Sequence, residues 1–218
     1  MTEKEMRLYL YVVTTINRNY LPQVFSSNKG MSAPNVVDNL ITLGTCKPRI
    51  RTSLHKNFDK YENYVVGLSP SCTTPRKVLY VARIQELITF KEAWERGEEN
   101  EIYKYKRGGH SPLNSDPTRV FMNGDIIIRS MDGTNYTFVN GVHKNDWDTY
   151  IIGGTKVGSK KDIYAVGDPQ HSRYYLDKGP VFSEEMFTRF WKGYPMMRNH
   201  RILFGDDAKK LLQTIRKS

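Results

Sequence analysis

Short segments rich in β-branched and aromatic residues recur along the chain between turn-forming residues, and this pattern most limits the folds available to it. Residues 7–15 form the clearest predicted strand, because they contain no glycine or proline and are mostly aromatic or β-branched. Other predicted strands lie over residues 39–43, 64–68, 77–87, 119–123, 125–130, 162–166 and 201–204. Helices are predicted near residues 46–56, 90–97, 183–192 and 206–217. Because strands and helices do not alternate as β–α–β units, we predict an α+β fold: a small, strongly curved or barrel-like mixed β-sheet with a few flanking helices.

The chain has no clean linker and no internal repeat, so its 218 residues are predicted to form a single domain, 1–218. Two regions interrupt the strand pattern. Residues 97–118 are polar and rich in glycine and charge, which is typical of an insertion loop that closes over a ligand. Residues 120–180 are predicted to form a second, β-rich insertion.

The balance of charge favours an acidic partner. Lysine and arginine together number 33 against 23 aspartates and glutamates, a formal net charge of +10. The chain also has 14 tyrosines, whose rings stack and whose hydroxyls bind polar groups. Nucleic acid or a nucleotide is therefore the predicted partner, and a basic surface that is merely solvated is the alternative.

Cysteine content and hydropathy argue against zinc-site and membrane-spanning proteins. The two cysteines, Cys46 and Cys72, are too few for a four-cysteine zinc site, and the sequence contains no HExxH motif. No metal or cofactor is predicted. The N-terminus lacks an apolar signal core and no apolar run reaches membrane-spanning length, so we expect a cytoplasmic protein with free thiols and no membrane partner.

Residues 42–53 combine an apolar run, a glycine turn and a basic helix start. After Gly44, the chain places Lys47, Arg49 and Arg51 at every second position. A strand that turns into a helix leaves backbone N–H groups open to an anion, and basic residues at a helix start oppose the macrodipole unless an anion offsets them. We therefore predict a phosphate or nucleotide site, with a solvated helix start as the alternative. Its predicted residues are Thr45, Lys47, Arg49, Arg51 and Thr52.

Individual residues outside this set are candidates for chemistry or stacking. Cys46 beside basic groups is a candidate nucleophile, although a free cysteine is more often a small buried residue. Aromatic rings that stack a base are predicted at Tyr11, Trp94 and Trp147, and a place in the core is the alternative for each.

Basic residues late in the chain are candidates for contacts with a nucleic-acid backbone. Residues 153–160 lack the P-loop order, so they are predicted to form a glycine hairpin that presents Lys156 and Lys160. Arg198 and Arg201 are predicted to add salt-dependent contacts. Several histidines and aspartates are scattered without metal-ligand spacing, so solvated loop side chains are the default interpretation and a metal or nuclease site is the alternative. They are His110, His143, His171, His200, Asp116, Asp146, Asp148, Asp162 and Asp168.

Several segments, taken in order, resemble one family. The most specific is Cys-Lys-Pro-Arg-Ile-Arg at residues 46–51, and four others accompany it: Leu-Tyr-Leu-Tyr-Val-Val (8–13), Tyr-Val-Val-Gly (64–67), Leu-Tyr-Val-Ala-Arg-Ile-Gln-Glu (79–86) and Thr-Phe-Lys-Glu-Ala-Trp (89–94). Together they resemble the second family of nucleotide-modification-associated domains, best over residues 7–103. This resemblance implies work with modified bases in bacteria and phages, but the family offers no established catalytic residues to transfer. By fold analogy alone, the chain is also similar to the pseudouridine-synthase-like barrel group, which includes base-flipping readers.

Two functions from different classes follow. The first is a binding module that recognises a nucleotide or nucleic acid, through a modified or flipped base, in DNA modification or phage defence. The alternative is an enzyme of nucleotide or base modification, a transferase or hydrolase, in the same context. A protein partner in such a system is a third interpretation, in which the charge serves assembly.

Overall fold

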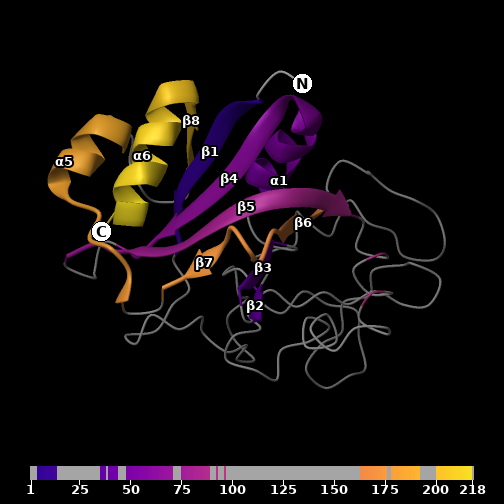
Figure 1. Ribbon diagram of the computed structural model, residues 1–218, viewed down its shortest axis with the longest axis horizontal. Coiled ribbons are helices and arrows are strands. Elements are labelled where there is room, and N and C mark those ends of the chain that lie inside the picture. Colours follow the sequence, from indigo (N-terminus) through magenta and orange to yellow (C-terminus); the bar gives the residue numbers. More distant parts are fainter. Residues whose placement is uncertain are drawn as a thin grey trace.

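The computed structural model describes residues 4–13, 35–37, 39–43, 48–70, 75–88, 92, 96, 163–175, 178–191 and 200–217 (Figure 1). The strands are β1 (Glu5–Val12), β2 (Asn35–Val37), β3 (Leu40–Leu43), β4 (Tyr61–Leu68), β5 (Val78–Ile88), β6 (Tyr164–Gly167), β7 (Arg173–Tyr174) and β8 (His200–Phe204). The helical elements are α1 (Pro48–His55), η1 (Phe58–Lys60), α5 (Glu184–Met186), η4 (Phe187–Trp191) and α6 (Gly205–Lys217). Predicted elements over residues 97–162 lie outside the described residues, as does most of the predicted helix over residues 90–97.

The strands form one mixed sheet, which confirms the predicted α+β class. Their order is β2-β3-β6-β5-β4-β1-β8, and β7 pairs with β5 beside this path. β1 runs parallel to β4, with Leu8 opposite Tyr64, and antiparallel to β8, with Leu8 opposite Leu203. The other pairings are antiparallel.

The predicted barrel-like closure is not supported. Among the described residues, β2 and β8 are the two ends of the strand path and do not pair with each other, so the sheet is open. Closure into a barrel requires its outermost strands to pair. The strand pattern in the sequence is compatible with an open sheet and with a closed barrel, because short strands occur in both. Only long-range strand pairing distinguishes the two.

Helices cover both faces of the sheet, and the alternation of side chains along β1 explains why this strand is buried on both sides. Leu8 and Leu10 face α6 and η4, where they join a cluster that includes Trp191. Tyr9 and Tyr11 face the opposite side, where Ile50 and Leu54 of α1 pack. Figure 1 shows α5 and α6 together on one side of the strands. Each fully buried aliphatic side chain contributes about 1.5–3 kcal/mol to folding.

Buried Arg7 fastens the end of α1 to the sheet. Its Nε donates to Oδ1 of Asn63 on β4 (2.8 Å), and its Nη1 and Nη2 donate to the backbone oxygens of Lys56 (3.1 Å) and Leu54 (3.2 Å). The guanidinium also lies 4.6 Å from the ring centroid of Tyr61. These bonds satisfy carbonyls that the helix leaves without partners at its C-terminal end.

Among the described residues, helices cover only part of the sheet on the α6 side. α6 packs against β1 and β8. Val81 of β5 faces this side, so Arg83, two residues further along the strand, faces it as well. Beyond the flank of α6, the strands β5 and β7 therefore present polar side chains to a hollow. Of the helices within the described residues, none combines the length and apolar character needed to cross a bilayer.

Candidate functional site

The structure places two arginines of the predicted phosphate site in different surroundings. Arg49 is exposed on α1, whereas Arg51 is fully buried, and its Nη1 donates to the backbone oxygen of Ile163 at 2.8 Å. Residues two apart on a helix point about 200° apart, so these two arginines cannot face one ligand from the helix surface. Thr52 is half-buried on the same helix. Thr45 and Lys47 lie outside the described residues, and the anion site on this segment stays a prediction.

Of the other predicted residues, two lie within the described part of the chain, Tyr11 and Arg201. Tyr11 is fully buried, and its hydroxyl hydrogen-bonds to the hydroxyl of Tyr80 at 2.6 Å. Arg201 is half-buried on β8, opposite Leu10 of β1. The remaining candidates lie outside the described residues: Cys46, Trp94, Trp147, Lys156, Lys160 and Arg198.

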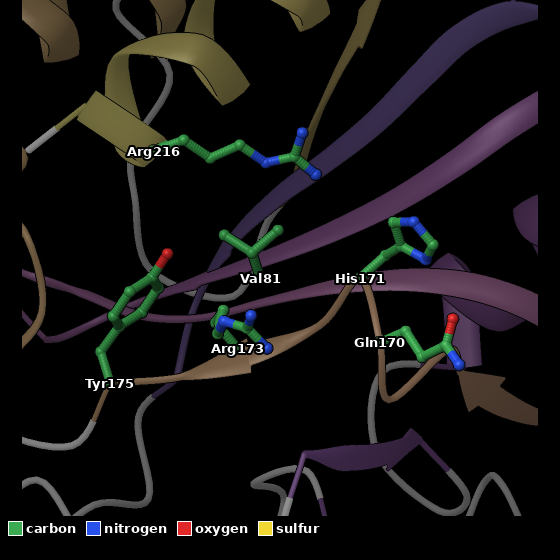
Figure 2. Close-up of a pocket in the computed structure, with 6 residues that line it drawn as sticks. All are labelled: Val81, Gln170, His171, Arg173, Tyr175 and Arg216. Carbon is green, nitrogen blue, oxygen red and sulfur yellow. The ribbon is translucent and has the colours of Figure 1, made fainter.

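A cleft of about 400 Å³ opens beside α6 instead. Its lining residues are Val81, Gln170, His171, Arg173, Tyr175 and Arg216. Figure 2 shows Arg216 reaching from the end of α6 over Val81, with His171 to one side and Tyr175 to the other. The cleft thus combines the strands β5 and β7, the residue after β7, the end of α6 and the segment that joins β6 to β7.

The segment of residues 168–172, here called the connecting turn, exists because β6 and β7 both pair with the same edge of β5. Gly167 lies opposite Ile84, and Arg173 lies opposite Val81. The backbone N–H of Asp168 donates to the Arg83 oxygen (2.7 Å), and the Arg83 N–H donates to Oγ of Ser172 (3.3 Å). A Cβ on Gly167 would lie 2.7 Å from the backbone oxygen of Ile41, so the turn begins where only glycine fits.

Asp168 is the polar centre of the connecting turn. Its Oδ2 accepts from Nδ1 of His171 (2.5 Å) and from Nη1 of Arg83 (3.1 Å), and its Oδ1 accepts from the Gln170 N–H (2.9 Å). Burial by itself raises the pKa of this carboxyl, but the hydrogen bonds from His171 and Gln170, the charge of His171 and the hydrogen bond from Arg83 outweigh it and leave the pKa below its ordinary value. The carboxylate is therefore ionised at neutral pH.

Arg83 joins Asp168 to a second carboxylate. Its Nε lies 3.0 Å from Oε1 of Glu62 on β4, and the same Oε1 accepts from the hydroxyl of Tyr64 at 3.0 Å. Glu62, Arg83, Asp168 and His171 thus form one continuous polar chain across β4, β5 and the connecting turn. Because Arg83 lies between two carboxylates, its charge is already matched within the protein.

Arg173 and Arg216 differ from Arg83. Among the described residues, no carboxylate lies within ion-pair distance of either guanidinium. Arg173 donates to the backbone oxygen of Ser172 at 3.1 Å, and both arginines are exposed. The cleft therefore carries two guanidinium charges that remain available to an anion.

Tyr175 supplies the aromatic wall of the cleft. Burial raises the pKa of its phenol, and the charges of Arg216 and Arg173 offset only part of that rise. The hydroxyl is therefore protonated at neutral pH and can donate a hydrogen bond. A smaller hollow of about 190 Å³ is lined in part by Glu62, Arg83 and Asp168. Within the described part of the chain, no three metal-binding side chains gather.

Sequence reasoning noted His171 and Asp168 only among scattered acids and histidines, and it did not select Arg173, Tyr175 or Arg216. One local signal was present. The stretch Gly-Asp-Pro-Gln-His at residues 167–171 places an aspartate three residues before a histidine within a glycine–proline turn. Such spacing allows one side chain to fold back onto the other, but nothing in it indicates that Arg216, 45 positions later, arrives at the same place.

The described fold and cleft define an open mixed-sheet α+β domain with a basic polar cleft at one helix end. The family model described as nucleotide modification associated domain 2 matches residues 7–190. The chain belongs to this family, which confirms the resemblance inferred from residues 7–103 and extends it through the connecting turn to η4. Neither the curated proteins nor the solved structures contain a significant match. The family description associates the chain with nucleotide modification, and the open sheet gives no support to the barrel analogy.

Proposed function

We propose that the cleft binds a nucleotide, free or within nucleic acid, and that Arg173 and Arg216 hold its phosphate. The observation that carries this proposal is the contrast between arginines: Arg83 lies between two carboxylates, whereas Arg173 and Arg216 face the cleft with no carboxylate within reach among the described residues. Guanidinium groups bind phosphate oxygens through paired, charge-assisted hydrogen bonds. A volume of about 400 Å³ is within the range of small-ligand sites.

The rest of the lining suits the other parts of a nucleotide. The ring of Tyr175 offers a face for a base or sugar, and the Gln170 carboxamide carries both a donor and an acceptor for a base edge. Val81 gives the floor an apolar surface. This set supports recognition of a modified or flipped base in DNA modification or phage defence, the context that the family resemblance implies. The net charge of +10 favours the approach of any such anion.

The competing explanation for Arg216 is local. It lies in the last turn of α6 together with Lys217, where any cation stabilises the helix macrodipole. Lys217 is exposed on the same turn and does not line the cleft, so it is a matched control.

The test is titration of the full chain with each 5′-mononucleotide, and with single- and double-stranded DNA and RNA, with and without a modified base. We expect Arg173→Ala and Arg216→Ala each to weaken binding by about 10-fold or more, the value of a charge-assisted hydrogen bond. Lys217→Ala should change affinity by less than about 2-fold. Equal small losses from Arg216→Ala and Lys217→Ala would show that generic charge, not the cleft, attracts the ligand.

A further inference from the structure

His171 is oriented more firmly than binding alone requires. Its Nδ1 lies 2.5 Å from Oδ2 of Asp168, and a carboxylate only accepts hydrogen bonds, so Nδ1 carries the proton. In the neutral ring, Nε2 is then the acceptor. The side chain is 49% exposed and forms part of the cleft wall (Figure 2). A histidine with a basic ring nitrogen therefore belongs to the wall of the same cleft as Arg173 and Arg216.

The groups around His171 hold this arrangement from several elements. Asp168 is fixed by Arg83 of β5 and by the Gln170 N–H, and Arg83 is fixed in turn by Glu62 of β4. Arg173 of β7 and Arg216 of α6 add positive charge across the cleft. A base oriented by a carboxylate, beside cations that stabilise developing negative charge, is the arrangement that hydrolytic sites use.

The lining also limits the bond that such a site can cleave. None of the described residues that line the cleft is a carboxylic acid able to protonate a poor leaving group. Tyr175 is a weak acid whose pKa is raised further by burial. The leaving group that best suits this set departs as an anion without taking up a proton, as a phosphate does when a phosphoanhydride is cleaved.

We propose that the cleft hydrolyses nucleoside di- or triphosphates, with His171 as general base and Asp168 as its positioning residue. The water oxygen bonds to phosphorus, and one water proton moves to Nε2 of His171. The bridging P–O bond breaks, and its electron pair leaves with the departing phosphate or nucleotide. His171 then releases the proton to solvent. Arg173 and Arg216 stabilise the charge on the phosphoryl oxygens. This inference rests on the proposed function, because these arginines must first hold the nucleotide.

The experiment measures two quantities on the same full-length preparations: binding of nucleoside monophosphates, and release of phosphate or pyrophosphate from nucleoside di- and triphosphates, with and without Mg²⁺. We expect His171→Asn to lower turnover by about 100-fold or more while monophosphate affinity changes by less than about 3-fold. His55→Asn removes an exposed histidine of α1, which packs on the opposite face of the sheet, and it should leave both quantities unchanged.

Three further variants separate chemistry from folding. His171→Gly should lose turnover and regain part of it when imidazole is added, which a purely structural role for the ring would not produce. Asp168→Asn should lower kcat with little change in KM, and Asp168→Glu should restore part of the loss. Both results support the proposal.

The outcomes are distinguishable from failure of the proposed function. Binding of monophosphates without release of phosphate or pyrophosphate from any nucleotide would overturn hydrolysis and leave nucleotide binding standing. Full turnover in His171→Asn would overturn the role of His171 as the base. Absence of nucleotide binding to the native chain would overturn both proposals together.

Discussion

Two arginines on the α1 side of the sheet are buried and bonded to the backbone, whereas two on the α6 side are exposed in a cleft. On the α1 side, Arg51 is fully buried and donates to the Ile163 backbone, while Arg7 reaches from β1 to the end of the helix. On the α6 side, Arg216 is exposed and lines a cleft with Arg173. The same guanidinium group is structural where it is buried against backbone acceptors, and it is exposed in a cleft where no carboxylate among the described residues pairs with it. A dense run of basic residues therefore does not by itself locate an anion site.

The greatest change should come from Arg51, and it tests whether this buried arginine on the α1 side stabilises the fold. Arg51→Met leaves the buried Ile163 oxygen without its donor, so we expect the free energy of unfolding to fall by about 2–4 kcal/mol. Arg49→Met, two positions earlier on the exposed side of α1, should cost less than about 0.5 kcal/mol. Urea denaturation measures both values, and similar losses for the two variants would contradict the assignment of Arg51 as structural.

The second prediction tests whether the exposed arginines on the α6 side, Arg173 and Arg216, bind the nucleotide. The double variant Arg173→Ala/Arg216→Ala should weaken nucleotide binding by about 100-fold or more, or about 2.7 kcal/mol, because both phosphate donors are lost. Arg49→Ala, which removes the exposed arginine of the predicted phosphate site, should change affinity by less than about 3-fold. A larger loss from Arg49→Ala, measured by the same titration, would move the anion site back to the segment of residues 42–53.

A smaller effect is expected where the connecting turn leaves β6. Gly167→Ala places a Cβ against the Ile41 oxygen, so we expect a loss of about 1–3 kcal/mol in stability together with weaker binding, since the turn carries His171. Gly205→Ala strains a positive φ of 50° at the opposite end of α6 from Arg216. It should lower stability by about 1 kcal/mol and leave affinity unchanged. Unaltered binding in Gly167→Ala would show that the turn does not shape the cleft.

The smallest effect is the pH dependence of stability that Asp168 contributes. Its pKa in the folded protein is lower than the ordinary value of 3.8, so the folded state favours the ionised form. This contribution is complete above the ordinary value, and it is lost as the pH falls through the lowered one. Urea unfolding of the native chain and of Asp168→Asn across acidic pH should show their difference shrinking in that window. A difference that stays constant with pH would contradict the hydrogen-bonded carboxylate.

Local signals predicted much of the fold. The strands at residues 64–68 and 77–87 and the helices near residues 46–56 and 206–217 are confirmed, because strand and helix periodicity and turn residues act over short distances. The mixed sheet is confirmed as well, whereas its closure is not. Closure depends on whether β2 and β8 meet, and no short segment of sequence encodes that contact. The same limit applies to Arg51, whose burial follows from the placement of β6 more than 100 positions later.

The amino-acid sequence alone is enough to identify the class of the protein: a basic α+β chain of the nucleotide modification associated family, with strands and helices at defined positions. Local propensity and charge are properties of neighbouring residues, so they can be recognised without coordinates. Which charged groups meet depends on the tertiary fold. Asp168, His171 and Arg173 join Arg216 because β6 and β7 share one edge of β5 and α6 ends above it. Long-range strand pairing and helix packing create that proximity, and the local spacing of residues does not indicate either of them.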